Sequence, residues 1–135
     1  MNSDPLPSSD ARPKRVLIVD DDEDARDVLG ELISALGHQA LQAATATEAI
    51  EQVERHQLDL ALIDLSMPEV DGYEVARRIR RTISGAGIRL IALTGYSDEV
   101  TRRVAAAAGF DDFVVKPAYS TTLERVVNAE PPIRG

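Results

Sequence analysis

Short apolar runs alternate along the chain with longer segments whose apolar residues recur at helical spacing. The first, third and fourth runs are almost continuously apolar, which is typical of parallel strands covered on both faces. The second run is half polar, as expected of a strand at the edge of a sheet. In order, the runs are RVLIVD (15–20), QALQAA (39–44), LALIDL (60–65), RLIALT (89–94) and DFVVKP (112–117).

The segments between these runs carry apolar stripes with the period of an amphipathic helix. The stripes are Val28, Leu29, Leu32, Ile33 and Leu36; Ala46, Ala49, Ile50 and Val53; Tyr73, Val75, Ala76 and Ile79; Val100, Val104 and Ala107; and Leu123, Val126 and Val127. Strand–helix units joined by right-handed crossovers predict an α/β fold, a doubly wound parallel sheet of five strands. Its expected strand order is 2-1-3-4-5, that of a flavodoxin-like (βα)5 fold, with the ligand crevice outside the carboxyl ends of strands 1 and 3.

The composition is that of one globular domain between two polar tails. A length of 135 residues and an apolar content of 44% suffice for one sizeable core. The stretches 1–14 and 130–135 are expected to be tails, the first of them disordered, around a domain of residues 15–129.

Charge and cysteine content exclude several classes of function. The formal net charge of −8 argues against a surface for nucleic acid or an anionic membrane. The chain has no cysteine, which excludes disulfides, thiolate catalysis and zinc–cysteine sites. No apolar run has the length of a signal-peptide core or a membrane span, so we expect a cytoplasmic protein without membrane contact.

A run of five acidic residues, 20–24, directly follows the first expected strand. By itself this run has two interpretations of about equal weight. The carboxylates could start a helix, whose free N–H groups and positive end they suit, or they could form half of a cation site.

The other strand ends decide between these interpretations. Asp64 closes the third expected strand, Thr94 the fourth and Lys116 the fifth. Because parallel strands bring their carboxyl ends to one crevice, we expect these side chains to meet Asp20 and Asp21. The remaining acidic residues of the run, 22–24, are expected to serve the helix N-terminus instead.

Three carboxylates, a hydroxyl and an ammonium in one crevice predict a phosphoryl site that uses Mg²⁺. Two carboxylates about 4 Å apart repel by roughly 4 kcal/mol at an effective dielectric constant near 20, so a cation among them makes the cluster tolerable. A site with only oxygen ligands suits Mg²⁺ and disfavours zinc. Asp64 is the best candidate nucleophile, because an aspartate is ionised at neutral pH and needs no general base. Thr94 and Lys116 would then hold the oxygens of the transferring phosphoryl group.

With these residues in place, the chain resembles the receiver domain of two-component response regulators. The blocks VLIVDDD, LALIDLSMPEVDGYE, IALTGY and AGFDDFVVKP are similar to those of the family, in order and at the right intervals, over about residues 15–128. The resemblance implies that Asp64 accepts a phosphoryl group from a histidine kinase or a histidine phosphotransfer protein. It also implies a switch in a phosphorelay rather than an enzyme with multiple turnovers.

The resemblance further implies a role for each site residue. Asp21, Asp64 and the backbone carbonyl of Ser66 would ligate Mg²⁺, with Asp20 helping through water.

Thr94 and Lys116 would respond to the phosphoryl group, and Phe113 would turn with Thr94. The face from the fourth strand to the fifth helix would then change conformation for an unknown downstream protein partner. The bond between Lys116 and Pro117 is expected to be cis. Few residues follow the last expected helix, too few for a DNA-binding domain, so we expect a stand-alone receiver or one excised from a hybrid kinase.

Two other classes of function compete with this one. A small phosphatase of the haloacid-dehalogenase type also combines a nucleophilic aspartate, a lysine and Mg²⁺, but it needs Asp-x-Asp-x-Thr/Val after strand 1, and residues 20–24 lack the last of these. It also places its lysine before a final acidic pair, whereas Asp64 here precedes both Thr94 and Lys116. A receiver-like scaffold that binds partners without phosphorylation is the third hypothesis, and the intact site argues against it.

Two basic clusters and three aspartates outside the crevice are expected to lie in solvent. The basic clusters ARRIRR (76–81) and TRR (101–103) fall on helical segments and are interpreted as solvated helix faces. Asp59, Asp111 and Asp112 precede strands and are interpreted as solvated loop residues.

Overall fold

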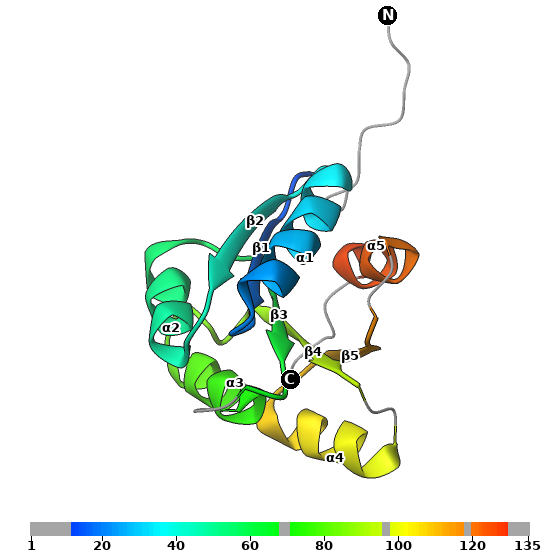
Figure 1. Cartoon of the computed structure of the whole chain (residues 1–135). Helices are drawn as coiled ribbons and strands as arrows, with labels where there is room; N and C mark the ends of the chain where they lie inside the picture. The colour runs from blue at the N-terminus through cyan, green and yellow to red at the C-terminus, as the bar shows by residue number, and fades with distance from the viewer. Residues whose placement is uncertain (1–11, 68–70, 96–97, 118–119, 130–135) are drawn as a thin grey trace, which may run out of the picture.

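The computed structural model describes residues 12–67, 71–95, 98–117 and 120–129. Five strands alternate with five helices along this part of the chain (Figure 1). The strands are β1 (Arg15–Val19), β2 (Gln39–Ala43), β3 (Leu60–Asp64), β4 (Arg89–Thr94) and β5 (Asp112–Val115). The helices are α1 (Glu23–Ala35), α2 (Ala46–Arg55), α3 (Gly72–Arg81), α4 (Glu99–Ala108) and α5 (Ser120–Asn128). The expected tails lie largely outside the described residues, so the division of the chain into a domain and two tails stays a prediction.

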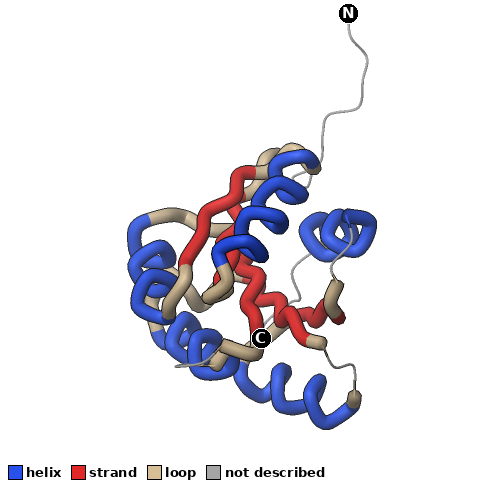
Figure 2. The backbone as a smooth tube through the Cα atoms, viewed as in Figure 1, coloured by secondary structure: helices blue, strands red, loops and turns tan. Residues whose placement is uncertain are grey.

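All strands are parallel and form one sheet in the order β2-β1-β3-β4-β5, which confirms the predicted topology. Helices α1 and α5 cover one face of the sheet, and α2, α3 and α4 cover the other (Figures 1 and 2). The strands β1, β3 and β4 lie between these layers and are buried almost throughout, whereas the edge strand β2 is largely half-exposed. The continuous apolar runs therefore mark the strands that are covered on both faces, as predicted.

Four helices begin at a side chain that accepts a hydrogen bond from the first turn. Asp22 caps α1, Thr45 caps α2, Asp71 caps α3 and Asp98 caps α4. Each cap satisfies a backbone N–H that has no partner within its helix. The role predicted for residues 22–24 at a helix N-terminus is confirmed, since Glu23 and Asp24 occupy the first turn of α1.

The stripe predicted for the fourth helical segment is wrong. Val100 is 68% exposed and Val104 is 44% exposed, and Ala107 is also exposed. The buried side of α4 carries Ala105 and Ala108 instead. Both sets have helical spacing, and the sequence pattern favoured the larger valines, whereas alanines allow the helix to lie close to its neighbours α3 and β5.

In the first helix the predicted stripe is right except at its edge. Leu29 and Ile33 are buried, whereas Val28 is 59% exposed on the side toward the carboxyl ends of the strands. Its exposed position is explained by a cleft described below.

Arg80 and Asp111 do not lie in solvent, contrary to the sequence-based interpretation. Their side chains form an ion pair of 2.7 Å and are 16% and 5% exposed. Arg80 also donates to the carbonyls of Gly85 and Gly109, and Asp111 accepts from the backbone N–H of Leu90. The pair therefore joins the loops that lead into β4 and β5. The sequence does not reveal this pairing, because each of the two residues stands among other charged residues.

The end of α5 is held by two cationic side chains. Arg89, which begins β4, donates to the carbonyl of Val126, and Lys14 donates to that of Val127 at 2.6 Å. Carbonyls in the last turn of a helix lack helical partners and carry partial negative charge, so cations stabilise this end. Lys14, the last residue of the expected N-terminal tail, is thus bonded to the domain. None of the helices in the described part of the chain is long and apolar enough to cross a membrane.

Candidate functional site

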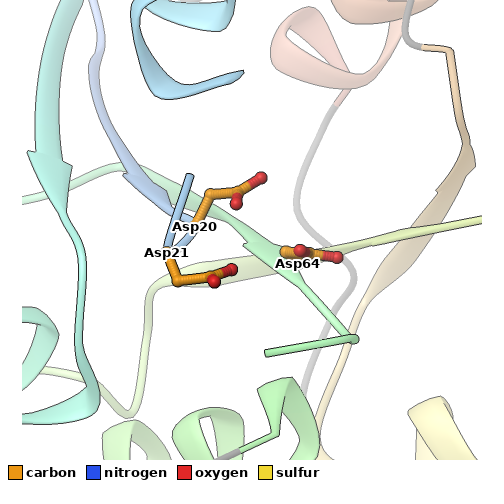
Figure 3. Close-up of side chains that lie close together, drawn as sticks. All are labelled: Asp20, Asp21 and Asp64. Carbon is orange, nitrogen blue, oxygen red and sulfur yellow. The ribbon is translucent and has the colours of Figure 1, made fainter. Parts of the chain in front are cut away.

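The carboxylates of Asp20, Asp21 and Asp64 gather at the carboxyl end of the sheet (Figure 3). Asp20 and Asp21 directly follow β1, and Asp64 is the last residue of β3, its neighbour in the sheet. Each residue offers one oxygen, and these three oxygens all lie within 4.8 Å of one another. Asp20 and Asp64 are buried, whereas Asp21 is exposed. The structure therefore brings together the acidic residues that the sequence placed in one crevice.

Lys116 reaches this cluster from the edge strand of the sheet. Its Nζ donates a hydrogen bond of 2.9 Å to Oδ1 of Asp64. The lysine side chain is 41% exposed, while that of Asp64 is 6% exposed. The ammonium thus partly neutralises a buried carboxylate and remains accessible from solvent.

Thr94 and Lys116 are connected by a backbone hydrogen bond at the site. The N–H of Lys116 donates to the carbonyl of Thr94 at 2.7 Å, immediately beyond the last register pair of β4 and β5. Thr94 is 2% exposed and ends β4, one register position beyond the pair of Asp64 with Leu93. The peptide bond between Lys116 and Pro117 is cis, as the resemblance implied.

The loop after β3 turns back on the carboxylate of Asp64. The N–H of Ser66 donates to Oδ1 of Asp64 at 3.2 Å, and the N–H of Gly72 donates to the carbonyl of Leu65 at 3.3 Å. Gly72 is packed so closely that a Cβ there would lie 2.3 Å from the backbone oxygen of Asp64. A side chain does not fit at this position, because the first residue of α3 lies against the backbone of Asp64.

Crowding and burial make the cluster unfavourable for negative charge. Burial raises the pKa of Asp20 above its ordinary value, the N–H of Asp22 lowers it, and the negative charge of Asp64 raises it again. A divalent cation among these oxygens would offset both burial and repulsion. Since every side-chain atom that the cluster offers as a metal ligand is a carboxylate oxygen, the site fits Mg²⁺.

A cleft of about 560 Å³ opens beside the carboxylates. Its polar side is formed by Asp20, Asp22, Asp24 and Lys116, and its apolar side includes Val28 of α1 together with Leu93 and Pro117. The exposed position of Val28 is thus explained, because the residue lines a surface next to the site and not the core.

Phe113 lies below Thr94 on the same face of the sheet. Phe113 is paired in register with Ala92, and Thr94 is two residues further along β4. Because every second residue of a strand points to the same face, the side chains of Phe113 and Thr94 lie on one face of the sheet. Phe113 is half-buried and packs against the core between the sheet and helices α2, α3 and α4.

Comparison with known proteins places this arrangement in a family. The sequence model of the response regulator receiver domain matches residues 16–128. A 14.6 kDa protein of Leptolyngbya boryana is 38% identical over 112 residues, which cover 83% of this chain and 86% of the relative. The CAI-1 autoinducer sensor kinase/phosphatase of Vibrio cholerae is 33% identical over 131 residues, which cover 96% of this chain and 19% of the relative.

A solved structure carries the same fold together with the metal. The receiver domain of a sensor histidine kinase from Pseudomonas aeruginosa has a magnesium ion coordinated in its active-site cleft. It is 28% identical, with a TM-score of 0.77, over 86% of this chain and 95% of that chain. Several curated relatives are longer, and this chain spans about half of their length or less.

The chain belongs to the receiver domain family of two-component response regulators. Members of this family are signalling switches that work with histidine kinases, and they bind Mg²⁺ at an acidic pocket of the kind formed by Asp20, Asp21 and Asp64. The family thereby accounts for the fold and for the acidic cluster.

Proposed function

We propose that Asp64 accepts a phosphoryl group and that the chain acts as a phosphorylation-controlled switch in a two-component phosphorelay. The observation that carries this proposal is the hydrogen bond from Lys116 to Asp64 beside the two carboxylates that follow β1. A buried carboxylate that holds a cation on one side and faces acidic metal ligands on the other is suited to form a bond to phosphorus.

The chemistry needs few protein groups. A carboxylate oxygen of Asp64 attacks the phosphorus atom, the bond between phosphorus and the donor's imidazole nitrogen breaks, and an acyl phosphate remains on Asp64. Mg²⁺, held by Asp21, Asp64 and the carbonyl of Ser66 with Asp20 acting through water, would supply positive charge for the phosphoryl oxygens. Lys116 and the hydroxyl of Thr94 bind the same oxygens from β4 and β5.

The proposed output follows from the two strands that carry Thr94 and Lys116. When Thr94 moves toward the phosphoryl group, Phe113 turns on the same face of the sheet, and the surface of β4, α4, β5 and α5 changes population. This surface exposes Val100, Val104 and Val115, which supports its use by a downstream protein partner.

The proposed phosphodonor is a histidine kinase or histidine phosphotransfer protein in the cytoplasm. The cleft beside the site supports this assignment, because its apolar side at Val28 and Pro117 adjoins Asp20 and Lys116. A donor helix could place its apolar face there and its phosphohistidine at Asp64.

Incubation with acetyl phosphate and Mg²⁺, followed by intact mass measurement, tests the proposal. We expect a gain of one phosphoryl group that requires Mg²⁺ and is absent from Asp64→Ala. Rapid consumption of acetyl phosphate without a mass gain would favour a phosphatase instead. If neither gain nor consumption occurs with this donor or with a phosphorylated histidine phosphotransfer protein, the protein is a scaffold.

A further inference from the structure

The guanidinium group of Arg102 lies over the ring of Phe113. Its central carbon is 4.7 Å from the ring centroid, within the distance of about 6 Å at which a cation is attracted to an aromatic face. Arg102 is an exposed residue of α4, and α4 packs beside β5, which carries Phe113 (Figure 1). The contact therefore connects the surface of α4 with the strand that leads to Lys116.

Phe113 is held from two sides that differ in chemistry. The core that it packs against includes the small residues Ala92, Ala105 and Ala108 of β4 and α4. Arg102, in contrast, is a polar side chain on the solvent side of its helix. A turn of the ring deeper into the core would exchange the guanidinium for apolar neighbours, so the contact with Arg102 favours one of the two positions.

The contact occurs in the arrangement in which Lys116 binds the carboxylate of Asp64. Lys116 is hydrogen-bonded to Oδ1 of Asp64 itself, and the stacked arrangement of Arg102 on Phe113 occurs in the same conformation. Whatever stabilises this conformation selectively must be overcome when the conformation changes.

We propose that Arg102 is a positioning residue that holds Phe113 in the resting conformation and thereby opposes activation of the switch. This inference rests on the proposed function, because it assigns a regulator to the aromatic residue of that switch. By linkage, loss of the contact raises the resting population of the active conformation and favours phosphorylation to the same extent. A cation–π contact at an exposed site corresponds to a change of about two- to fivefold in that equilibrium.

Fluorine NMR of protein labelled with 4-fluorophenylalanine measures the position of the ring directly. The chain contains two phenylalanines, so the spectrum has one signal for Phe113 and one for the buried Phe110, which serves as an internal reference. Beryllofluoride with Mg²⁺, a mimic of the acyl phosphate, defines where the Phe113 signal lies in the active conformation. Arg102→Gln removes the positive charge, whereas Arg102→Lys keeps the charge but replaces the planar guanidinium with an ammonium group.

Arg103→Gln is the matched control. Arg103 is the next residue, and it pairs with Glu99 of its own helix at 2.8 Å. Without beryllofluoride, we expect the Phe113 signal of Arg102→Gln to lie closer to the active position than in the wild type, with Arg102→Lys between them and Arg103→Gln unchanged. Read from the same signal, the apparent affinity for beryllofluoride should be about two- to fivefold higher in Arg102→Gln.

The outcomes separate this inference from the proposed function. If beryllofluoride moves the wild-type Phe113 signal but Arg102→Gln leaves both the resting signal and the apparent affinity for beryllofluoride as in the wild type, the role of Arg102 is refuted while the switch stands. If Arg102→Gln and Arg103→Gln have equal effects, the effect is one of surface charge, and the inference is likewise refuted. If intact mass shows no phosphorylation of the wild type, the proposed function fails first.

Discussion

Lys116 Nζ donates a hydrogen bond of 2.9 Å to Oδ1 of Asp64, 52 residues earlier in the chain. Asp64 ends β3 and Lys116 directly follows β5, and these two strands are not neighbours because β4 lies between them. The lysine crosses the end of β4, where Thr94 is buried, and so assembles residues of three strands around one carboxylate. This arrangement leads to several predictions about stability and chemistry.

Substitution of Gly72 by alanine should disturb the site through the backbone. A Cβ at this position would lie 2.3 Å from the carbonyl oxygen of Asp64, so α3 or β3 must shift. We expect a loss of about 1–3 kcal/mol in the free energy of unfolding, measured by urea denaturation, and slower phosphorylation by acetyl phosphate. Gly87→Ala is the control, because a Cβ at Gly87 meets no atom within 4 Å. Equal stability and phosphorylation rates in the two variants would contradict the close contact.

Replacement of Asp20 by asparagine should stabilise the protein when Mg²⁺ is removed. Burial raises the pKa of Asp20, and the charge of Asp64 adds to this effect, so the ionised carboxyl is less favourable in the folded than in the unfolded state. Its contribution to stability is present at low pH and is lost as the pH rises through the folded-state pKa. At pH 7 in EDTA we expect the Tm of Asp20→Asn to rise by about 3 °C.

Mg²⁺ should stabilise the wild type more than it stabilises Asp20→Asn. A bound ion stabilises the folded state by mass action, and the variant lacks one of the acidic groups that favour the ion. The Tm of the wild type is therefore expected to rise more with added MgCl₂ than that of Asp20→Asn. Glu31→Gln, an exposed change on α1 away from the cluster, should behave as the wild type. Identical Mg²⁺ responses in all three proteins would place the ion elsewhere.

Removal of the Arg80 side chain should destabilise the loops that lead into β4 and β5. Arg80→Met leaves the carboxylate of Asp111, 5% exposed, without its ion-pair partner. Breaking a buried pair in this way costs about 3 kcal/mol. Arg81→Met changes an exposed residue of the same helix and should stay within about 0.5 kcal/mol of the wild type. Urea denaturation measures both, and a similar small loss in each would mean that Arg80 is solvated after all.

His38 should make stability depend on pH below neutrality. Its Nδ1 accepts a hydrogen bond of 3.0 Å from the backbone N–H of Lys14, and burial, with the positive charge of Lys14, lowers its pKa. The folded state therefore binds a proton less readily than the unfolded state, so stability is fully present above the ordinary pKa of about 6.5 and falls as the pH decreases below it.

Urea denaturation at pH 5.5 and 7.5 tests this contribution. We expect the wild type to lose more stability between the two pH values than His38→Gln, which has no proton to bind at this position. A loss of equal size in both proteins would show that other groups account for the pH dependence.

The fold could be predicted because its strongest signals are local and repeated. Apolar runs such as LALIDL mark strands buried on both faces, and their alternation with helical stripes restricts the topology. The gathering of Asp20, Asp64, Thr94 and Lys116 followed, since the ends of parallel strands meet at one edge of the sheet.

The sequence alone could not predict which side chains from distant parts of the chain contact each other. Arg80 and Asp111 each look like one charge among many, and their pairing depends on two loops that meet only after folding. The buried side of α4 was also ambiguous, because its alanines and valines have equivalent spacing. The stacking of Arg102 on Phe113 has no local signal at all, since the residues are on different elements.

The most direct test of the central claim is to locate the phosphoryl group. Borohydride reduces an acyl phosphate of aspartate to homoserine, so treatment after phosphorylation marks the modified residue permanently. Peptide mass spectrometry should find homoserine at position 64 and unchanged aspartate at Asp20 and Asp21. Homoserine at either of the latter positions, or phosphate retained on a histidine, would contradict the assignment of Asp64 as the phosphoacceptor.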